Sequence, residues 1–469
     1  MDGTLVRNDL THELVAAIGL RTPLDLPRAI QLGLKDKPAM KRFMLDRHGY
    51  AVSAENLPYQ DRVVDLARAH KARGGKVYLC SGSHEDVVKC VVEHNAWLDG
   101  GWGTRDGLNL TSSNKADFLR GEFPDGFDYV GNSTQDYEVW KAARKGYAIN
   151  PPRGVSGIRT ATGAPVEVLE RPSGNAKAIL KAMRVHQWAK NGLMFLVPLL
   201  TFAELSLRDI FNVGFGFVAF SLLASATYIL NDLVDIDNDR KHATKRYRML
   251  ASGRISIPQA VVMMGVLSGL SVLIAAFLPS SFWPVMVLYL VVTLAYSFRL
   301  KRVAIADVLT LSGLFSLRVF AGATLVLQPV SPWLLNFIAV FFLNLALVKR
   351  YTELRKKPAT EPGSEPEIIA GRGYVKSDET LVLALGVAMA SLALLSFFLY
   401  GLLAPNRVIE SGYAIGAVAA ILLYWMMRVW LLAHRGRMND DPVLFAIKDR
   451  LSLFLGTFVV VLVVTGHML

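Results

Sequence analysis

Hydrophobic and polar positions divide the chain into two parts. Residues 1–185 mix short apolar runs with many charged positions, as in an ordinary globular sequence. From residue 186 onwards, apolar runs of about 17–25 residues alternate with basic loops, and each run is long enough to cross a hydrocarbon core of about 30 Å. We predict nine membrane spans, near residues 189–204, 209–231, 258–278, 282–298, 303–326, 331–348, 381–403, 411–427 and 451–468.

The loops between these spans differ strongly in charge. The loops after the second, fourth, sixth and eighth spans are rich in Lys and Arg, whereas the opposite loops carry only Arg208 and Arg407. By the positive-inside rule, the basic loops and residues 1–185 face the cytoplasm and Leu469 lies outside, in a multi-pass protein of a bacterial-type plasma membrane. The net charge of +12 therefore indicates lipid headgroups as partners, and not nucleic acid.

The polar part has the pattern of an α/β domain. We expect strands near 76–80 and 127–130, a helix from His84 to Asn95, and a helical, cap-like insertion over 10–60. The predicted boundaries are an α/β head over 1–150, a linker rich in Pro, Gly, Ser and Thr over 151–176 with a strand near 165–169, and an all-α membrane domain over 177–469. Cys80 and Cys90 both lie in the head and are too few for a disulfide framework, which suits a reducing compartment.

An acidic cluster follows the second predicted span. Asn231, Asp235 and Asp239 are spaced four residues apart and share one face of a helix, and Asp232 lies beside them. Carboxylates this close at a membrane boundary repel one another, and a hard cation such as Mg²⁺ relieves that repulsion. We predict a Mg²⁺ site formed by Asp232, Asp235 and Asp239; the alternative is a solvated acidic helix end.

Cations follow the acidic cluster directly. Lys245, Arg246 and Arg248 lie within the next ten residues, before an Ala-Ser-Gly-Arg segment that ends at Arg254. Phosphate chemistry uses both a bridging metal and cationic side chains, which neutralise the charge on a departing group. Membrane topology alone also places cations here, so both interpretations stay open.

These segments together resemble the first signature of the UbiA superfamily of intramembrane transferases. A second region, from Ala295-Tyr296-Ser297 through Lys301 and Asp307 to Leu317-Arg318 and Gly322, is similar to the second signature. The resemblance covers about 178–469. It implies a nine-helix bundle in which two acidic motifs hold Mg²⁺ and a diphosphate.

Within this superfamily, the second motif separates two branches. Aromatic prenyltransferases commonly carry a second Asp four positions on, where this chain has Leu311. The lone Asp307 resembles the branch of decaprenyl-phosphate phosphoribosyltransferases, as do Gln187-Trp188-Ala-Lys190-Asn191 and Lys349-Arg350-Tyr351-x-Glu353. That branch implies phosphoribosyl diphosphate as donor and a polyprenyl phosphate as acceptor.

The resemblance assigns roles to individual residues. The expected catalytic residues are Asp232, Asp235, Asp239, Lys245, Arg246, Lys301 and Asp307. The expected substrate-binding residues are Gln187, Lys190, Asn191, Asn231, Arg248, Tyr296, Arg318, Lys349 and Arg350. The charged segments 371–378 and 435–450 receive no role.

Two other functions remain open at this stage. The first is an aromatic prenyltransferase that uses a prenyl diphosphate and an aryl acceptor. The second is a transporter or lipid-binding protein whose acidic cluster binds cations without chemistry, although no paired broken helices in two halves support it. Trp188 and Lys190 also suit an interfacial anchor, whereas Arg318 within a span is costly unless it faces a cavity.

The head resembles the haloacid-dehalogenase superfamily. Asp2-Gly3-Thr4-Leu5 is similar to part of its first motif, and Ser81, Lys115 and Asn132 with Asp136 follow in the family's order. The resemblance implies a phosphatase-like site of Asp2, Ser81, Lys115, Asn132 and Asp136. The family's nucleophile is the first Asp of its Asp-x-Asp-Gly-Thr motif, and here Met1 matches the x position and Asp2 the second Asp. Either translation starts upstream of Met1, or this head cannot form an aspartyl-phosphate. A phosphate-sensing or structural module is the alternative.

Overall fold

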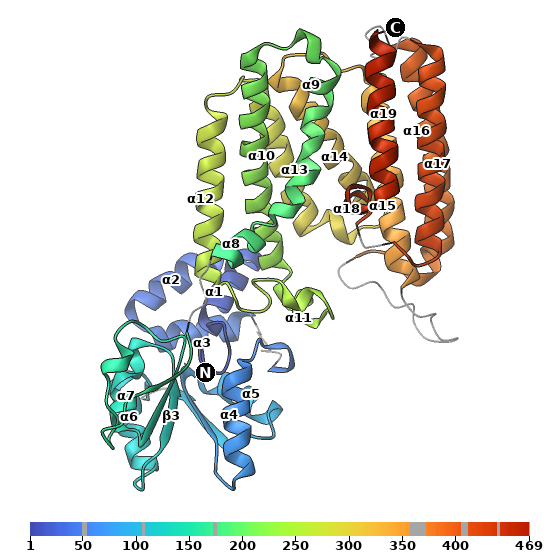
Figure 1. The fold of residues 1–469 in the computed structure, drawn as a ribbon. Coiled ribbons are helices and arrows are strands. Elements are labelled where there is room, and N and C mark those ends of the chain that lie inside the picture. Colours follow the sequence, from blue (N-terminus) through green and yellow to red (C-terminus); the bar gives the residue numbers. More distant parts are fainter. Residues whose placement is uncertain are drawn as a thin grey trace. The chain divides into compact units, whose positions relative to one another are not determined.

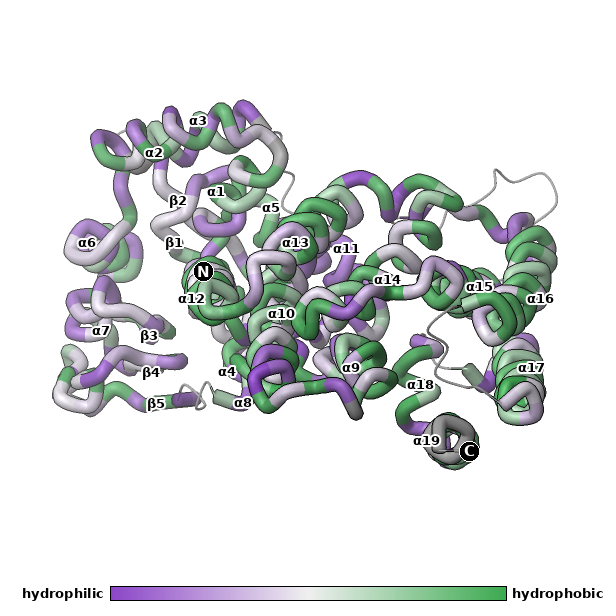
Figure 2. The backbone as a smooth tube through the Cα atoms, turned by 90° about the horizontal axis from the view of Figure 1, so that it is seen from above, coloured by the Kyte–Doolittle hydropathy of each residue, from purple (hydrophilic) through white to green (hydrophobic). Residues whose placement is uncertain are grey.

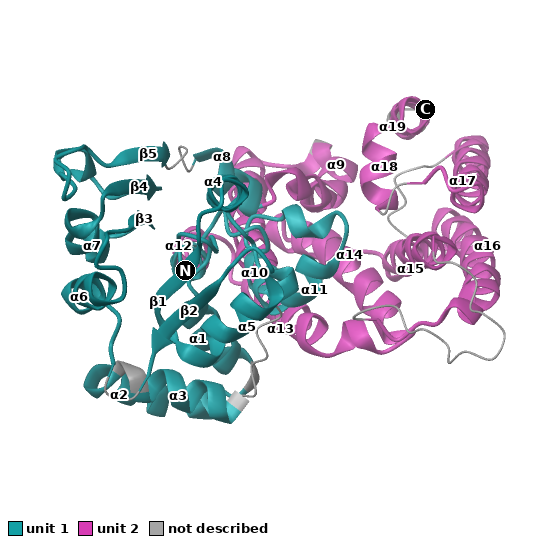
Figure 3. Ribbon diagram, turned by 90° about the horizontal axis from the view of Figure 1, so that it is seen from below, with its two compact units in different colours: residues 1–183, 229–263 teal, residues 184–228, 264–469 magenta. Residues whose placement is uncertain are grey.

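The computed structural model describes residues 1–48, 54–105, 108–171, 176–356, 372–404, 411–438 and 441–468. Arg407, cited above for its loop charge, lies outside these ranges. The chain forms two compact units, shown in different colours in Figure 3. Unit 1 comprises Met1–Met183 and Ile229–Met263, and unit 2 comprises Arg184–Tyr228 and Met264–Leu469.

Unit 1 contains the α/β part of the chain. Its strands are β1 (Tyr78–His84), β2 (Gly100–Thr104), β3 (Asp128–Gly131), β4 (Lys145–Ile149) and β5 (Glu167–Glu170). Its helices are α1 (Leu10–Arg21), α2 (Leu26–Lys35), α3 (Lys37–His48), α4 (Asp61–Ala72), α5 (Glu85–His94), α6 (Ser112–Glu122), α7 (Tyr137–Ala142), α8 (Ala176–Ala182) and α11 (Ile236–Lys241). Figure 1 shows this order of strands and helices.

The strands of unit 1 pair in parallel. β1 pairs with β2, and β3, β4 and β5 form a second sheet in that order. Parallel neighbours need crossover connections, which α5 and α7 supply between β1 and β2 and between β3 and β4. The predicted alternation of strands and helices is thus found, as two small sheets. The predicted helical segment over 10–60 corresponds to α1, α2 and α3.

Within the described ranges, six helices are long and apolar enough to cross a membrane. They are α10 (Leu207–Val234), α12 (Ile257–Ala275), α14 (Ala306–Leu325), α15 (Pro332–Arg355), α16 (Glu379–Leu403) and α17 (Gly412–His434). Shorter apolar stretches include α13 (Phe282–Phe298) and Arg450–Val463 within α19 (Arg450–Met468). The short α18 (Pro442–Lys448) precedes α19. Figure 2 shows hydrophobic residues along these helices and more hydrophilic ones in the sheets and helices of the head.

The first predicted span is not one continuous α-helix. Residues 189–204 fall in a 3₁₀ helix, Val185–Phe195, followed by the five-residue α9 (Leu196–Leu200) and a further 3₁₀ turn. Pro198 lies inside α9, and a proline lacks the backbone N–H that would continue a regular helix. The count of nine spans is therefore not confirmed by the described residues, which show six.

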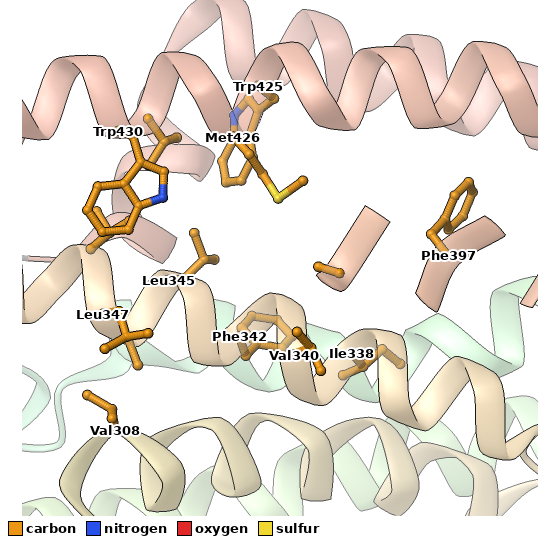
Figure 4. Packing of buried hydrophobic residues seen from close by; sticks show 14 of the residues in the cluster. Val308, Ile338, Val340, Phe342, Leu345, Leu347, Phe397, Trp425, Met426 and Trp430 are labelled. Atoms are coloured by element: carbon orange, nitrogen blue, oxygen red, sulfur yellow. The ribbon is translucent and has the colours of Figure 1, made fainter. Parts of the chain in front are cut away.

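Aromatic and aliphatic side chains fill the core of unit 2. Leu345 of α15 points toward Trp430 and Met426 of α17 (Figure 4). Phe342 stacks on Phe315 of α14 with ring centres 4.5 Å apart. The indole N–H of Trp430 donates to Asn344 Oδ1 at 2.8 Å, which satisfies a polar group between two apolar helices. This packing fixes α15, which carries Lys349 and Arg350.

Candidate active site

The first acidic cluster lies where α10 gives way to α11. Asp235 separates the two helices, with φ −96° and ψ 8°. Its N–H still donates to the carbonyl of Asn231 at 3.0 Å, and its own carbonyl accepts from Asp239 at 2.8 Å. The four-residue spacing predicted from the sequence is thus kept through the break.

Two carboxylates of this cluster converge on one cation. Arg248 Nη1 donates to Asp232 Oδ1 at 3.1 Å and to Asp239 Oδ2 at 2.6 Å. Both aspartates are buried, with 4% and 3% of their surface exposed. The pKa of Asp239 is raised chiefly because burial disfavours its charged form, while Arg248 and Lys245 act in the opposite direction. Two buried carboxylates therefore share one positive nitrogen.

This geometry suits a divalent cation bound together with substrate. No three of the described His, Cys, Asp and Glu side chains lie close enough together to hold a metal ion on their own. Mg²⁺, however, is usually bound by one or two carboxylates together with substrate phosphates and waters. Asp232 and Asp239 already direct oxygens to one cationic position, so they fit such an ion. Half-buried Asp235 lies between them in sequence.

The basic segment after α11 is accessible. Lys245 and Arg246 are both exposed in a 3₁₀ turn, Lys245–Tyr247. Arg246 lies over the ring of Tyr247 and donates to its hydroxyl at 2.9 Å. Both side chains therefore reach solvent, and their role toward an anionic ligand stays a prediction.

The second motif is built around Asp307, which is fully buried in the first turn of α14. Tyr296 donates to Asp307 Oδ1 at 2.9 Å, and Arg372 Nη1 lies 3.2 Å from the same oxygen. Arg350, also fully buried, forms an ion pair with Asp307 through Nε and a second one with Glu353. Asp307 is thus held by two arginines and a tyrosine, and Asp307 and Glu353 together balance the charges of the two arginines.

The backbone before Asp307 is in an unusual conformation. Ile305 has φ +68°, a left-handed value that a β-branched residue rarely adopts. Its N–H donates to the hydroxyl of buried Tyr374 at 2.9 Å. Tyr374 follows Arg372 by two residues, so the same segment supports the strained residue and supplies a cation to Asp307.

A second set of cations in unit 2 surrounds Asp441. Lys190 Nζ forms an ion pair with Asp441 Oδ2, while Oδ1 accepts from Val443 N at 3.1 Å and Leu444 N at 3.2 Å and so caps α18. Burial opposes ionisation of Asp441, but Lys190 and Lys349 together with these hydrogen bonds keep its pKa below the usual value. Predicted binding residues Lys190 and Lys349 thus share one carboxylate.

Arg318 is enclosed by rings. Its guanidinium lies 5.3 Å from the ring centres of Tyr289 and Phe315, and its Nε donates to Asn191 Oδ1 at 2.9 Å. Asn191 in turn donates to Ser221 Oγ at 3.0 Å. A charge this deep in an apolar helix needs such partners. Arg318 and Asn191, predicted separately, therefore form one buried assembly.

Three further predicted residues of the membrane half lie at separate positions in the chain. Lys301 is buried in a 3₁₀ turn, Leu300–Arg302. Gln187 is half-buried, and its N–H donates to Arg184 O at 2.7 Å. Asn231 is also half-buried. We therefore keep the roles assigned to these three side chains as proposals.

The head brings its predicted residues together. The Asp2 carboxylate accepts from Leu10 N at 3.1 Å and from the hydroxyl of Ser83, whose N–H donates to Ser81 Oγ at 3.1 Å. On the other side, Thr4 Oγ1 donates to Asn132 Oδ1 at 3.0 Å. Ser83, to which the sequence assigned no role, donates a hydrogen bond directly to Asp2.

Lys115 and Asp136 form the second half of this cluster. Their charged atoms lie 3.7 Å apart, and Tyr129 donates to Asp136 Oδ1 at 2.6 Å. Burial opposes ionisation of Asp136, yet Lys115, Tyr129 and the N–H groups of Asn132 and Ser133 hold its pKa below the usual value. The cluster therefore combines a buried cation with an ionised carboxylate.

The head and the acidic cluster are connected within unit 1. Arg240, next to Asp239, forms two hydrogen bonds to Glu13 of α1, at 3.0 and 2.5 Å, and both side chains are buried. Gly253, with φ +68°, packs so tightly that a Cβ would lie 2.7 Å from Arg7 Cβ. Neither contact was predicted, because pairing over more than 200 positions leaves no local sequence signal.

Comparison with known proteins identifies the family. The UbiA prenyltransferase family profile matches residues 192–457. An uncharacterised protein, y4nM of Sinorhizobium fredii, is 35% identical over 98% of this chain and 88% of its own. A decaprenyl-phosphate phosphoribosyltransferase of Mycolicibacterium smegmatis is 36% identical over 39% of this chain and 59% of its own.

Among solved structures, a UbiA homologue from Archaeoglobus fulgidus bound to DMAPP and Mg²⁺ has a TM-score of 0.47 and 16% identity. The match covers 62% of this chain and 99% of that one. The family profile spans more than half of the sequence and includes both acidic segments, with Asp232 and Asp307. The chain therefore belongs to the UbiA prenyltransferase family, as a multi-pass membrane protein.

Proposed function

We propose that this protein transfers a phosphoribosyl group from phosphoribosyl diphosphate to a polyprenyl phosphate in a Mg²⁺-dependent reaction. The observation that carries the proposal is the state of Asp307, which is buried between Arg350 and Arg372. A carboxylate already engaged by two guanidinium groups is poorly suited to hold a second metal ion. Arg350 also pairs with Glu353, so the two arginines and two carboxylates of the second motif are held by one another and leave no carboxylate for a metal.

The two possible donors differ in charge and in chemistry. A prenyl diphosphate must ionise to an allylic cation, which favours a second set of carboxylates and an aromatic cavity. A phosphoribosyl donor carries an additional 5-phosphate, which favours extra Lys and Arg. This chain has Leu311 where the aryl pattern has its second Asp, and Lys190, Arg318 and Lys349 are available as further cations. The mycobacterial relative named above supports the same choice.

The first cluster would bind the diphosphate. Asp232 and Asp239, with Asp235, would hold Mg²⁺, which when bound neutralises and orients the diphosphate oxygens. Arg248 donates a hydrogen bond to each of these buried carboxylates and so acts against the effect of burial. The exposed Lys245 and Arg246, with Lys301, would stabilise the charge that develops on the leaving diphosphate.

Binding of the anionic substrates would fall to the cations of unit 2. Lys190 and Lys349 both lie near Asp441, and we expect a phosphate to bind beside these two cations. Gln187, Asn191 and Asn231 would donate or accept hydrogen bonds, and Tyr296 and Arg350 would hold the second motif in shape.

The head is proposed to handle phosphate as a haloacid-dehalogenase-like domain over residues 1–150. Hydrogen bonds through Ser83 link Asp2 to Ser81, and a second group joins Asn132 to the Lys115–Asp136 pair, an arrangement that suits a phosphate group. A phosphatase activity would suit a product that bears a 5-phosphate. The linker over 151–176 and the membrane domain over 177–469 complete the proposed organisation.

The test is a reaction with purified protein. Phosphoribosyl diphosphate and decaprenyl phosphate should release pyrophosphate only when both are present, and EDTA should abolish this until Mg²⁺ is restored. A parallel reaction offers a prenyl diphosphate and 4-hydroxybenzoate, because the family includes prenyltransferases. Prenylated hydroxybenzoate would overturn the proposal in favour of an aryl acceptor. Turnover of neither pair would favour a non-catalytic cation- or lipid-binding protein.

A further inference from the structure

Helix α2 of the head exposes large apolar side chains. Leu34 is 85% exposed, Ile30 is 53% exposed, and Leu24, just before the helix, is 92% exposed. Pro27, Ile30 and Leu34 are three and four residues apart, so they lie along one side of the helix. The opposite side packs inward through buried Ala29. An apolar strip of this kind gains free energy when it leaves water.

Cations border the strip. Arg28 and Lys35 are exposed, and each follows a residue of the apolar strip by one position. Because they are seven residues apart, they lie on one side of the helix, along the edge of the strip. The acidic residues at the two ends of α2 are engaged elsewhere. Asp25 pairs with Arg47 at 3.4 Å, and Asp36 Oδ1 accepts from Ala39 N, near the start of α3. The outer surface of α2 is therefore apolar and positive.

The fold holds α2 close to the point where unit 1 enters the membrane. α1 packs against α2, and the Glu13–Arg240 pair ties α1 to α11, directly after the membrane helix α10. The same unit contains the first turns of α12, where Val262 is 64% exposed, as a lipid-facing residue would be. In Figure 1, α2 lies near the level of that end of α12.

We propose that α2 is a membrane-surface helix that lies in the headgroup layer of an anionic bilayer. Ile30 and Leu34 insert toward the acyl chains, and Arg28 and Lys35 bind lipid phosphates at the same depth. Such helices insert by about 5–10 Å and combine apolar burial with attraction to anionic lipid. The proposed occupant is the bilayer that the first turns of α12 enter, and those turns belong to the same unit as α2. This inference does not depend on the reaction that the protein catalyses.

A depth measurement tests the proposal on the full chain in lipid nanodiscs. Cys80 and Cys90 are replaced by Ala, and an environment-sensitive fluorophore is attached to Leu34→Cys. The matched control carries the label at Arg68→Cys, an exposed position on α4. Spin-labelled lipid should quench the Leu34 label several-fold more than the control label, in discs that contain anionic lipid.

Charge reversal tests the role of the cations. Arg28→Glu with Lys35→Glu should lower quenching at Leu34 several-fold, whereas Arg68→Glu should leave it unchanged. Equal quenching at Leu34 and Arg68, or quenching that persists after charge reversal on α2, would overturn the proposal. Energy transfer between differently labelled copies without lipid quenching would also overturn it, because a second copy would then cover the strip.

Discussion

At the scale of single residues, the first cluster depends on where its carboxylates point. Asp232 and Asp239 converge on Arg248, whereas Asp237 belongs to the same acidic run and lies outside the proposed site. Asp232→Asn should lower kcat on the order of 10²–10³-fold and raise the Mg²⁺ concentration needed for half-maximal rate. Asp237→Asn should change neither by more than a small factor. Equal losses in the two variants would mean that activity depends on the total negative charge of this segment, and not on Asp232 and Asp239 in particular.

The sequence predicts individual residues well where the signal is local. Asp232, Asp239 and Arg248 lie within 17 positions, and their spacing and chemistry already indicate a shared site. Arg372 and Asp441 received no role, because each reaches its partner across more than 60 positions. Such pairs follow from packing of distant segments, which residue spacing does not report.

At the scale of elements, helix packing explains a glycine in the second signature. A Cβ at Gly322 of α14 would lie 1.8 Å from the carbonyl oxygen of Met194, so the two backbones touch. Gly322→Ala should therefore separate them and destabilise the protein by about 1–3 kcal/mol, measured as unfolding in detergent. Gly313→Ala on the same helix meets no atom within 4 Å and should be neutral. A neutral Gly322→Ala would contradict the close packing of α14.

The link between α1 and α11 makes a second prediction at this scale. Glu13→Ala leaves the buried Arg240 without its charged partner, which should cost about 3–5 kcal/mol of stability. Asp61→Ala breaks the more exposed Arg7–Asp61 pair in the same part of the head and should cost about 0–1 kcal/mol. Chemical denaturation of the three proteins measures the difference. Equal losses of unfolding free energy in Glu13→Ala and Asp61→Ala would contradict a stabilising Glu13–Arg240 pair. So would a Glu13→Ala, Arg240→Met double variant that is no more stable than Glu13→Ala.

Element types were more predictable than their continuity. The helical cap region and the helix from Glu85 appear where hydrophobic periodicity places them, whereas the strand expected over 76–80 runs from Tyr78 to His84. The run over 189–204 is apolar enough for a span, yet it forms short helices because Pro198 removes a backbone donor and Asn191 is held by Ser221 and Arg318. Hydropathy reports the environment of such a run, but not whether its backbone stays regular.

At the scale of the whole molecule, the distribution of charge predicts the topology. Cations concentrate in alternate loops, and the membrane potential and anionic lipids of a bacterial plasma membrane keep such loops in the cytoplasm. A cysteine at Pro329 or Leu403, in a Cys80→Ala and Cys90→Ala background, should react with an impermeant maleimide added to intact cells. A cysteine at Ser252, beside the first acidic cluster, should react only after the cells are opened. Labelling at position 252 from outside would place the head and the basic loops on the outer face. The proposed donor, phosphoribosyl diphosphate, could not reach them there from the cytoplasm.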